Sequence, residues 1–276
     1  MADAPEMPGL IDLLQKRGGH KYDHGHALIV AGGPGMGGAA RLAARAALRI
    51  GAGLVTIAPP ASAMIEHCGP PDALMRHPLD QARDLPGLLA ARRIGVIVIG
   101  PGCGVARAAS LLPAVLAADL PTVLDADAIT ALAGQEAPLP LRPDIVLTPH
   151  RGEFARLLPD LARNLPDDPE GLVQAARSAA RQLGATLLLK GPATAIASPS
   201  GESALNRAED APGLATAGSG DVLSGLIAGL LARGFTPFDA ARFGAHIHAE
   251  AARRFGPGLI ADDLPEQIPA ILGEGA

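Results

Sequence analysis

A glycine-rich segment late in the chain combines a phosphate-binding pattern with a carboxylate that could act as a base. Thr216 to Asp221 reads TAGSGD, and the apolar run that follows it predicts a helix over 219–233. Glycine lets the backbone approach a ligand closely, and the first amides of a helix lack intrahelical partners and attract anions. Asp221 falls in the first turn, where it could take a proton from a hydroxyl that attacks phosphorus. The alternative is an aspartate that only favours a helix start.

Two other glycine loops each follow an apolar run. Residues 32–38 read GGPGMGG after the run 27–31, and residues 100–102 read GPG at the end of the run 95–100. The first loop has neither the spacing of a dinucleotide fingerprint nor the terminal Lys-Ser or Lys-Thr of a Walker motif. Ligands of α/β sheets collect at the carboxyl ends of strands, so three glycine loops in that position favour one shared cleft.

Ionisable residues follow further apolar runs. His150 and Glu153 lie in TPHRGE, where His150 could contact a ligand and Glu153 could help to hold Mg²⁺ near phosphates. Lys190 could pair with a phosphate as a point charge. A structural histidine and a solvated lysine are the alternatives. Asp125 and Asp127 could face the cleft or cap a helix over 127–133, and the residues alone leave both interpretations open.

Two other groups of charged residues are interpreted as structural. Arg41, Arg45 and Arg49 repeat every fourth residue with no acidic partner between them, which favours a solvated helix face over a phosphate-binding stripe. His246 and His248 are two positions apart and would point in different directions on a helix, so they do not predict a metal pair.

The elements that must position these residues alternate along the chain. Continuous apolar runs predict strands whose two faces are both covered. These runs occupy 27–31, 54–58, 95–100, 122–125, 145–148 and 186–190. Ala/Leu-rich stretches predict helices over 39–50, 107–118, 170–184, 219–233 and 238–255. The alternation predicts an α/β fold with a largely parallel sheet.

Residues 194–206 break this rhythm, because TAIAS, PSG and ESALN predict a β-hairpin that turns at Pro199 to Gly201. The hairpin would place antiparallel strands at one edge of the sheet. No linker and no repeat interrupts the pattern, so we expect a single domain over 1–276.

Composition excludes several classes of protein. Hydrophobic residues make up 48% of the 276 positions, which is enough to bury a sizeable core, and aromatic residues only 2%. The net charge of −5 argues against a nucleic-acid partner. Cys68 and Cys103 show neither metal-ligand spacing nor a disulfide framework. We see no signal peptide and no apolar run of membrane-spanning length, so we expect a cytoplasmic protein without a membrane partner.

Six segments, in this order, resemble the ADP-dependent NAD(P)H-hydrate dehydratases, a branch of the ribokinase-like superfamily. The resemblance runs from about His20 to about Leu264. The segments are HKYDHGHALIVAGGPGMGGAARLAARAALRIGAGLVTIAPP, IGPGCG, VLDADAI, LTPHRGEFARLL, LLKGPATAIASPSG and GLATAGSGDVLSGLIAGLLARG. The resemblance implies a ribokinase-like three-layer α/β/α sandwich, with a mostly parallel central sheet and antiparallel edge strands.

The resemblance also implies a reaction and its partners. The S-epimer of NAD(P)H hydrate carries a hydroxyl where the intact ring has a double bond. A phosphoryl group from ADP would pass to that hydroxyl, and expulsion of phosphate would restore NADH or NADPH and leave AMP. The family is described as requiring Mg²⁺ and forming homotetramers. The dehydratase motifs begin close to the start of this sequence, so we expect any epimerase for the other hydrate epimer to be a separate protein.

Site roles carry over by motif. Asp221 resembles the general base, and Gly218, Ser219 and Gly220 resemble the anion hole. The residues that resemble nucleotide contacts are Lys190, Gly191, Pro192, Ala193 and Thr194, together with Gly220. The residues that resemble contacts to the hydrated cofactor are Ala39, Gly102 and His150, together with Asp221. Glu153 resembles the metal-linked acid of the superfamily.

The sequence departs from the family pattern at three places. The family usually has a small residue in place of Tyr22 and a proline in place of Arg151. Residues 208–212 replace a Thr-Gly-Asn-Pro-like stretch that borders the nucleotide site in the family, so we expect any difference from the family in nucleotide affinity or preference to arise there.

Two other functions fit parts of the pattern. A kinase of the same superfamily that acts on a vitamin precursor would share the anion hole and the aspartate base, although HKYDHGH and LTPHRGEF favour the dehydratase. A catalytically silent nucleotide-binding subunit would be expected to lack the base, whereas Asp221 is present.

Overall fold

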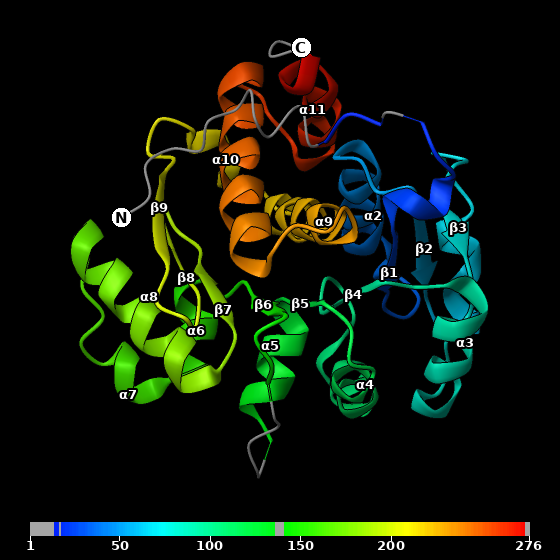
Figure 1. Cartoon of the computed structure of the whole chain (residues 1–276), viewed down its shortest axis with the longest axis horizontal. Coiled ribbons are helices and arrows are strands. Elements are labelled where there is room, and N and C mark those ends of the chain that lie inside the picture. Colours follow the sequence, from blue (N-terminus) through cyan, green and yellow to red (C-terminus); the bar gives the residue numbers. More distant parts are fainter. Residues whose placement is uncertain (1–13, 17, 136–140, 274–276) are drawn as a thin grey trace.

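A nine-stranded sheet runs through the part of the chain that the structure describes, and helices cover both of its faces (Figure 1). The structure is a computed structural model and describes residues 14–16, 18–135 and 141–273. The strand order is β3-β2-β1-β4-β5-β6-β7-β8-β9. The strands are β1 (His26–Val30), β2 (Leu54–Ala58), β3 (Met75–Arg76), β4 (Val96–Ile99), β5 (Thr122–Leu124), β6 (Ile145–Leu147), β7 (Thr186–Leu189), β8 (Ala193–Ala197) and β9 (Ser203–Arg207).

All strand pairs from β3 to β7 are parallel, whereas β7 pairs with β8, and β8 with β9, in antiparallel register. The six longer parallel strands are buried along their whole length, as their continuous apolar runs predict. The hairpin between β8 and β9 turns over 198–202, where the Ser198 amide donates to the Glu202 carbonyl at 3.0 Å. The predicted antiparallel edge is therefore confirmed.

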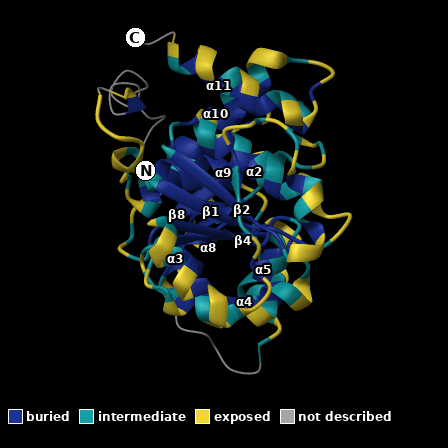
Figure 2. Cartoon of the chain, turned by 90° about the vertical axis from the view of Figure 1, so that its right-hand side faces the viewer, coloured by how far each residue is buried: buried dark blue, intermediate teal, exposed yellow. Residues whose placement is uncertain are grey.

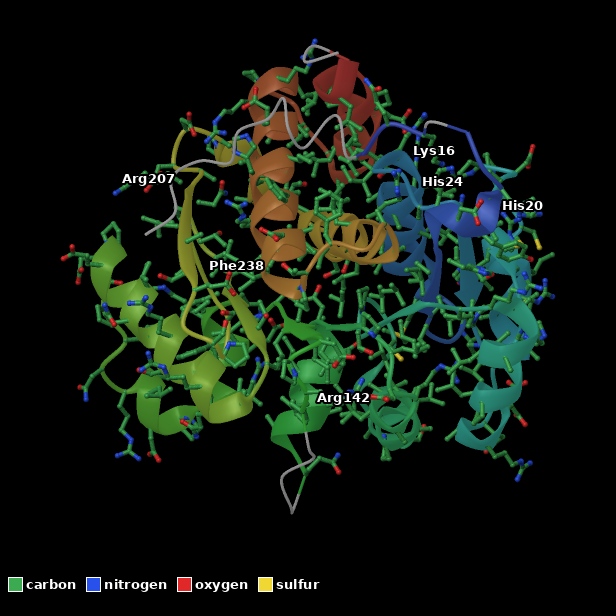
Figure 3. The ribbon with its side chains drawn as sticks, viewed as in Figure 1. Lys16, His20, His24, Arg142, Arg207 and Phe238 are labelled. Atoms are coloured by element: carbon green, nitrogen blue, oxygen red, sulfur yellow. The ribbon has the colours of Figure 1, made fainter. Side chains whose placement is uncertain are left out.

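Two separate apolar clusters lie on the two faces of the sheet, so the molecule has three layers. Figure 2 shows the buried strands between these layers, and Figure 3 shows side chains filling the space on both sides. One face carries α2 (Gly37–Arg49), α9 (Ser219–Ala232), α10 (Pro237–Phe255) and α11 (Leu264–Gly273). The other carries α3 (Leu85–Arg92), α4 (Val105–Ala117), α5 (Ala126–Ala133), α6 (Arg151–Leu157) and α8 (Pro169–Leu183), with the short α7 (Pro159–Ala162) beside them. The predicted three-layer α/β/α fold is confirmed.

Two glycines let α9 pack directly on α2. A β-carbon at Gly225 would lie 2.0 Å from the Ala43 carbonyl oxygen, and one at Gly229 would lie 2.1 Å from Ile50 Cγ2. Any side chain at these positions would push the two helices apart. The close packing brings the first turn of α9 beside the first turns of α2, which begins within the glycine loop 32–38.

Several short elements were not predicted from the sequence. β3 has two residues, and α3, α6 and α11 are short helices without a long apolar periodicity. The predicted helix over 39–50 begins earlier, at Gly37, because the second half of the glycine loop already has helical geometry. Within the described ranges, no helix has the length and hydropathy needed to cross a membrane.

Candidate active site

The first turn of α9 presents open backbone amides. Its N-cap, Gly218, has a positive φ of 90°, and no side chain caps the helix. The Ser219 hydroxyl is directed elsewhere, since it donates to the Leu214 carbonyl at 2.7 Å. Within the described chain, the amides of Gly220 and Asp221 make no hydrogen bond. Unsatisfied amides at the positive end of a helix dipole form a site for an anion.

Asp221 is a half-buried carboxyl whose proton affinity is strongly perturbed. Burial is the main cause that raises its pKa to about 7, and the negative charge of Asp125 adds to it. Lys190 acts in the opposite direction, and Asp127 and Glu153 raise the pKa further. A carboxyl that titrates near neutral pH can both accept and return a proton, as a general base must.

Lys190 lies at the end of β7, and its ammonium lies beside the first turn of α9. Its Nζ donates to Asp125 Oδ1 at 2.7 Å and lies 4.0 Å from Glu153 Oε2. A β-carbon built on Gly220 would lie 3.3 Å from Nζ, so the ammonium borders the open amides. Burial acts to lower the pKa of Lys190, but the ion pair with Asp125 outweighs it and the pKa lies above its ordinary value. Lys190 therefore stays charged.

The structure separates the roles of the two aspartates that follow β5. Asp125 is 1% exposed and bonds to Lys190, and it also accepts a 2.8 Å hydrogen bond from the Ser224 hydroxyl. Asp127 instead accepts a 2.8 Å hydrogen bond from the Gly104 amide and so holds the GPG loop in place. Although Asp125 occupies the N-cap position of α5, its side chain does not cap that helix.

The glycine loops contact one another beside α9. A β-carbon at Gly32 would lie 1.8 Å from the Gly102 carbonyl oxygen, and one at Gly102 would lie 3.0 Å from Ala39 Cβ. A β-carbon at Gly218 would lie 2.6 Å from Leu42 Cδ1 of α2. Glycine is therefore required sterically at these positions, and the three glycine segments come together at the carboxyl edge of the sheet.

His150 and Glu153 form the cap of α6. His150 Nδ1 accepts from the amides of Gly152 at 2.9 Å and Glu153 at 3.2 Å, while Glu153 Oε2 accepts from the His150 amide at 2.9 Å. The backbone of this turn adjoins Lys190, whose amide donates to the Pro149 carbonyl at 2.8 Å. The His150 side chain is 52% exposed and the Glu153 side chain 7%, so the imidazole faces outward while the carboxylate lies near Lys190.

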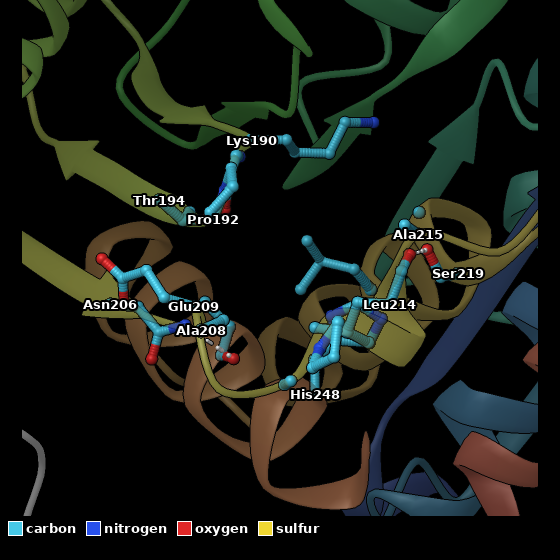
Figure 4. A pocket seen from close by; sticks show the side chains of 16 residues that line it. Lys190, Pro192, Thr194, Asn206, Ala208, Glu209, Leu214, Ala215, Ser219 and His248 are labelled. Carbon is cyan, nitrogen blue, oxygen red and sulfur yellow. Dashed lines mark hydrogen bonds between the residues drawn. The ribbon is translucent and has the colours of Figure 1, made fainter. Parts of the chain in front are cut away.

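A cavity of about 450 Å³ lies beside Gly220 (Figure 4). Lys190, Pro192 and Thr194 lie on its upper side in Figure 4, with Asn206 and Glu209 to one side and Leu214 and Ser219 opposite. Gly191 and Gly220 also line it, whereas Ala193 belongs to β8 and is not part of the lining. Thr194 Oγ1 donates to the Gly191 carbonyl at 2.8 Å, which holds the loop between β7 and β8 in a tight turn.

Sequence reasoning missed several residues of this cavity. Asn206, Leu223 and His248 line it, and Asn206 Nδ2 donates to the Ala245 carbonyl at 3.2 Å. Burial lowers the pKa of His248 to about 4, so its imidazole is neutral. These side chains come from β9, α9 and α10, and no local motif marks them, because only the packing of the three elements brings them together.

The three departures from the family pattern lie in different surroundings. Tyr22 precedes β1 at the amino edge of the sheet, where it stacks on His20 with ring centroids 5.3 Å apart. Arg151 is an exposed residue that pairs with Asp167 at 2.8 Å. The segment 208–212 contributes four residues to the cavity lining. Of the three departures, this segment is therefore the one that borders the cavity.

Known proteins match this chain over most of its length. A family model described as NAD(P)H-hydrate dehydratase matches residues 27–271. The bifunctional NAD(P)H-hydrate repair enzyme Nnr of Coxiella burnetii is 43% identical over 267 residues, which cover 94% of this chain and 53% of the relative. The Nnr of Moorella thermoacetica is 41% identical over 284 residues, covering 92% and 50%. The chain spans about half the length of the curated relatives it matches.

Solved structures extend the comparison to the fold. An ADP/ATP-dependent NAD(P)H-hydrate dehydratase from Bacillus subtilis, co-crystallised with ATP/Mg²⁺, has a TM-score of 0.80 and 28% identity, with 98% of each chain covered. Ribokinase of Arabidopsis thaliana, at 13% identity and a TM-score of 0.56 over 90% of this chain and 98% of that one, shares the fold alone. The chain thus belongs to the NAD(P)H-hydrate dehydratase family and has a ribokinase-like fold.

Proposed function

We propose that the protein dehydrates the S-epimer of NAD(P)H hydrate to NAD(P)H with ADP as phosphoryl donor, giving AMP and phosphate. The observation that supports this most directly is the position of Asp221. It lies in the first turn of α9, next to Gly220, which lines a cavity of nucleotide size, and to Gly218, which packs against Leu42 of α2. A base there can reach a hydroxyl on one side while the amides hold a phosphoryl group on the other.

The cavity suits the nucleotide. Pro192, Leu214 and Leu223 supply apolar walls for a base, and Lys190 and Gly220 lie at the end of the cavity nearest Asp221. With the nucleotide in this orientation, its terminal phosphate would meet the amides of Gly220 and Asp221. The Lys190 ammonium would neutralise part of its charge. Ala39, Gly102 and His150 remain our candidate contacts to the hydrated cofactor.

The chemical steps use this chain's own residues. Asp221 removes the proton from the ring hydroxyl as the hydroxyl oxygen bonds to the terminal phosphorus of ADP, and the bond to AMP breaks. The open amides stabilise the charge that develops on the transferred phosphoryl oxygens. The ring nitrogen lone pair then expels phosphate from the ring carbon, and loss of a proton from the adjacent carbon restores the double bond.

The side chains present fit a Mg²⁺ that is held mainly by the nucleotide. Among the described residues, no three histidine, cysteine or acidic groups form a metal cluster. Mg²⁺ commonly binds one or two carboxylates, substrate phosphates and several waters. Glu153, whose Oε2 accepts a hydrogen bond from the His150 amide, would help to hold the ion near the phosphates. When bound, the ion would supply positive charge to the phosphates.

The test mixes the purified protein with NADH hydrate, Mg²⁺ and either ADP or ATP, and follows the return of NADH absorbance. The proposal expects recovery that depends on added nucleotide, faster with ADP than with ATP. Recovery with ATP alone would contradict ADP as the donor. No recovery with either nucleotide, together with phosphorylation of a vitamin-precursor alcohol, would identify a kinase of the superfamily instead.

The remaining expectations concern the protein as a whole. A homotetramer, a single domain, a cytoplasmic location and a separate epimerase stay predictions. Sedimentation of the purified protein tests the first. Supplying the R-epimer alone tests the last, since a protein without epimerase activity leaves that epimer unchanged in the assay above.

A further inference from the structure

We propose that Asp125 and Ser224 form a positioning pair that holds the Lys190 ammonium at the boundary between the nucleotide cavity and Asp221. This inference rests on the proposed function, because it concerns the same site. It adds two residues that neither touch the nucleotide cavity nor act as the base, and whose part is to orient the cation between them.

Both oxygens of Asp125 are committed. Oδ1 accepts from Lys190 Nζ at 2.7 Å, and Oδ2 accepts from Ser224 Oγ at 2.8 Å. The backbone is equally constrained, since the Asp125 amide donates to the Ile99 carbonyl at 3.2 Å and a β-carbon at Gly100 would lie 1.7 Å from the Asp125 carbonyl oxygen. Because its backbone and its Oδ2 are held in this way, the Asp125 carboxylate presents Oδ1 to Lys190 in one orientation.

Lys190 has other carboxylates within reach, so its position requires an explanation. Glu153 Oε2 lies 4.0 Å from Lys190 Nζ, but it already accepts a hydrogen bond from the His150 amide. The carboxylate of Asp221 also attracts the ammonium. The shorter contact to Asp125 decides between them and keeps Nζ beside Gly220. Without it, the lysine side chain could turn toward either of the other carboxylates and leave the open amides.

Ser224 connects this pair to the catalytic helix. It lies three residues after Asp221 on α9, so the two side chains fall on the same face of the helix. Ser224 is fully buried and its hydroxyl donates to Asp125 from a sequence distance of 99 residues. One helix therefore supplies the open amides, the base and the hydroxyl that orients the partner of Lys190.

The pair also acts on the base. Asp221 is faced by Asp125, Asp127 and Glu153, which raise its pKa, and by Lys190, which lowers it. Loss of the Asp125 charge removes one of the raising causes and frees Lys190 to approach Asp221. Both effects lower the pKa of Asp221, so a positioning role predicts a pH signature that a general loss of folding does not.

Ser224→Ala is the least disruptive test, because it deletes one hydroxyl. We expect about fivefold weaker ADP binding by calorimetry and a similar drop in kcat, the size of one ordinary hydrogen bond, because the lost hydroxyl acts on ADP only through Asp125 and Lys190. Ser198→Ala is the matched control. Ser198 is another buried serine, whose hydroxyl bonds to the Glu202 carboxylate at 3.1 Å in the β8–β9 turn, and its loss should change neither quantity.

Asp125→Asn provides the pH signature. We expect the acidic limb of the kcat/KM profile to move to lower pH by about one unit, with a larger loss of ADP affinity than in Ser224→Ala. Adding Ser224→Ala to Asp125→Asn should cost little more, because the hydroxyl then has no charge to orient. Additive losses, or an unmoved acidic limb in a folded Asp125→Asn protein, would overturn the pair.

Failure of the proposed function has a different signature. If the unmodified protein binds ADP but regenerates no NADH, the dehydratase proposal fails. The positioning pair is then still tested by ADP affinity in the three variants. Equal ADP affinity in Ser224→Ala, Ser198→Ala and the unmodified protein would reject the pair whatever the reaction is.

Discussion

The starts of α9 and α6 are both helix N-termini at the carboxyl edge of the same sheet, yet they differ in how their amides are satisfied. At α6, His150 and Glu153 accept and return hydrogen bonds in a closed capping box. At α9, Gly218 offers no side chain and the Ser219 hydroxyl bonds to Leu214 instead. A helix start that satisfies itself can orient neighbouring groups, whereas one left open can bind an anion.

The charges around the two helix starts sharpen this contrast. Glu153 Oε2 accepts a hydrogen bond from the His150 amide and lies 4.0 Å from Lys190 Nζ. Asp221 lies in a setting that disfavours its negative charge and brings its pKa to about 7. The hydrogen bonds of a cap fix a carboxyl in place, while an uncommitted carboxyl with a perturbed pKa is available for proton transfer.

The largest expected effect comes from removing the base at α9. Asp221→Asn should lower turnover by about 100-fold or more while ADP still binds, because the amides and Lys190 remain. In the unmodified protein, kcat/KM should fall as the pH drops below about 7, where Asp221 takes up its proton. Unchanged turnover in the variant would remove Asp221 from the mechanism.

The same substitution should affect stability with the opposite sign. Because the folded-state pKa of Asp221 lies above the ordinary value of 3.8, the folded protein binds the proton more tightly than the unfolded chain does. This contribution favours folding at pH below 3.8 and is lost as pH rises to about 7. At pH 8, the free energy of unfolding of the Asp221→Asn variant should therefore be about 1–3 kcal/mol higher than that of the unmodified protein. Denaturant unfolding measures this difference. Equal free energies of unfolding for the variant and the unmodified protein at pH 8 would show that the surroundings of Asp221 do not disfavour its negative charge.

Gly218→Ala tests whether the open start depends on its backbone geometry. The residue has a φ of 90°, and an added β-carbon would meet Leu42 Cδ1 at 2.6 Å. We expect a loss of about 1–2 kcal/mol in the free energy of unfolding and about tenfold weaker ADP binding, since the turn that presents the amides must shift. Gly38→Ala is a matched control, because a β-carbon there meets no atom within 4 Å.

The smallest effect is expected at the capped N-terminus of α6. His150→Ala removes the acceptor of two amides and should cost about 1 kcal/mol of folding free energy, whereas His150→Asn should restore most of it as a good N-cap residue. Denaturant unfolding measures both. If His150→Asn is stable but has a raised KM for the hydrated cofactor, the imidazole contacts the substrate. If only His150→Ala is affected, the role of His150 is to cap α6.

Local sequence predicted much of the fold and part of the site. The continuous apolar runs predicted every parallel strand except β3, and the hairpin predicted the antiparallel edge, because strand burial and turn chemistry are encoded within a few residues. TAGSGD predicted the open helix start for the same reason, since glycine and the first turn of a helix are adjacent in the chain. What the segment did not reveal is that the nearby hydroxyl would bond elsewhere and leave the amides free.

Tertiary structure decided the contacts that join distant residues. Asp125 and Asp127 are equivalent in the sequence, but packing directs one to Lys190, 65 positions away, and the other to the Gly104 amide. Ser224 and His248 carry no local signal, because the partner of the first lies on another strand end and the surroundings of the second come from three elements. Sequence by itself determined which helix start would have glycine in place of a capping side chain. Only the folded sheet decided which charges face one another, since electrostatic interactions depend on distance in space and on burial rather than on order along the chain.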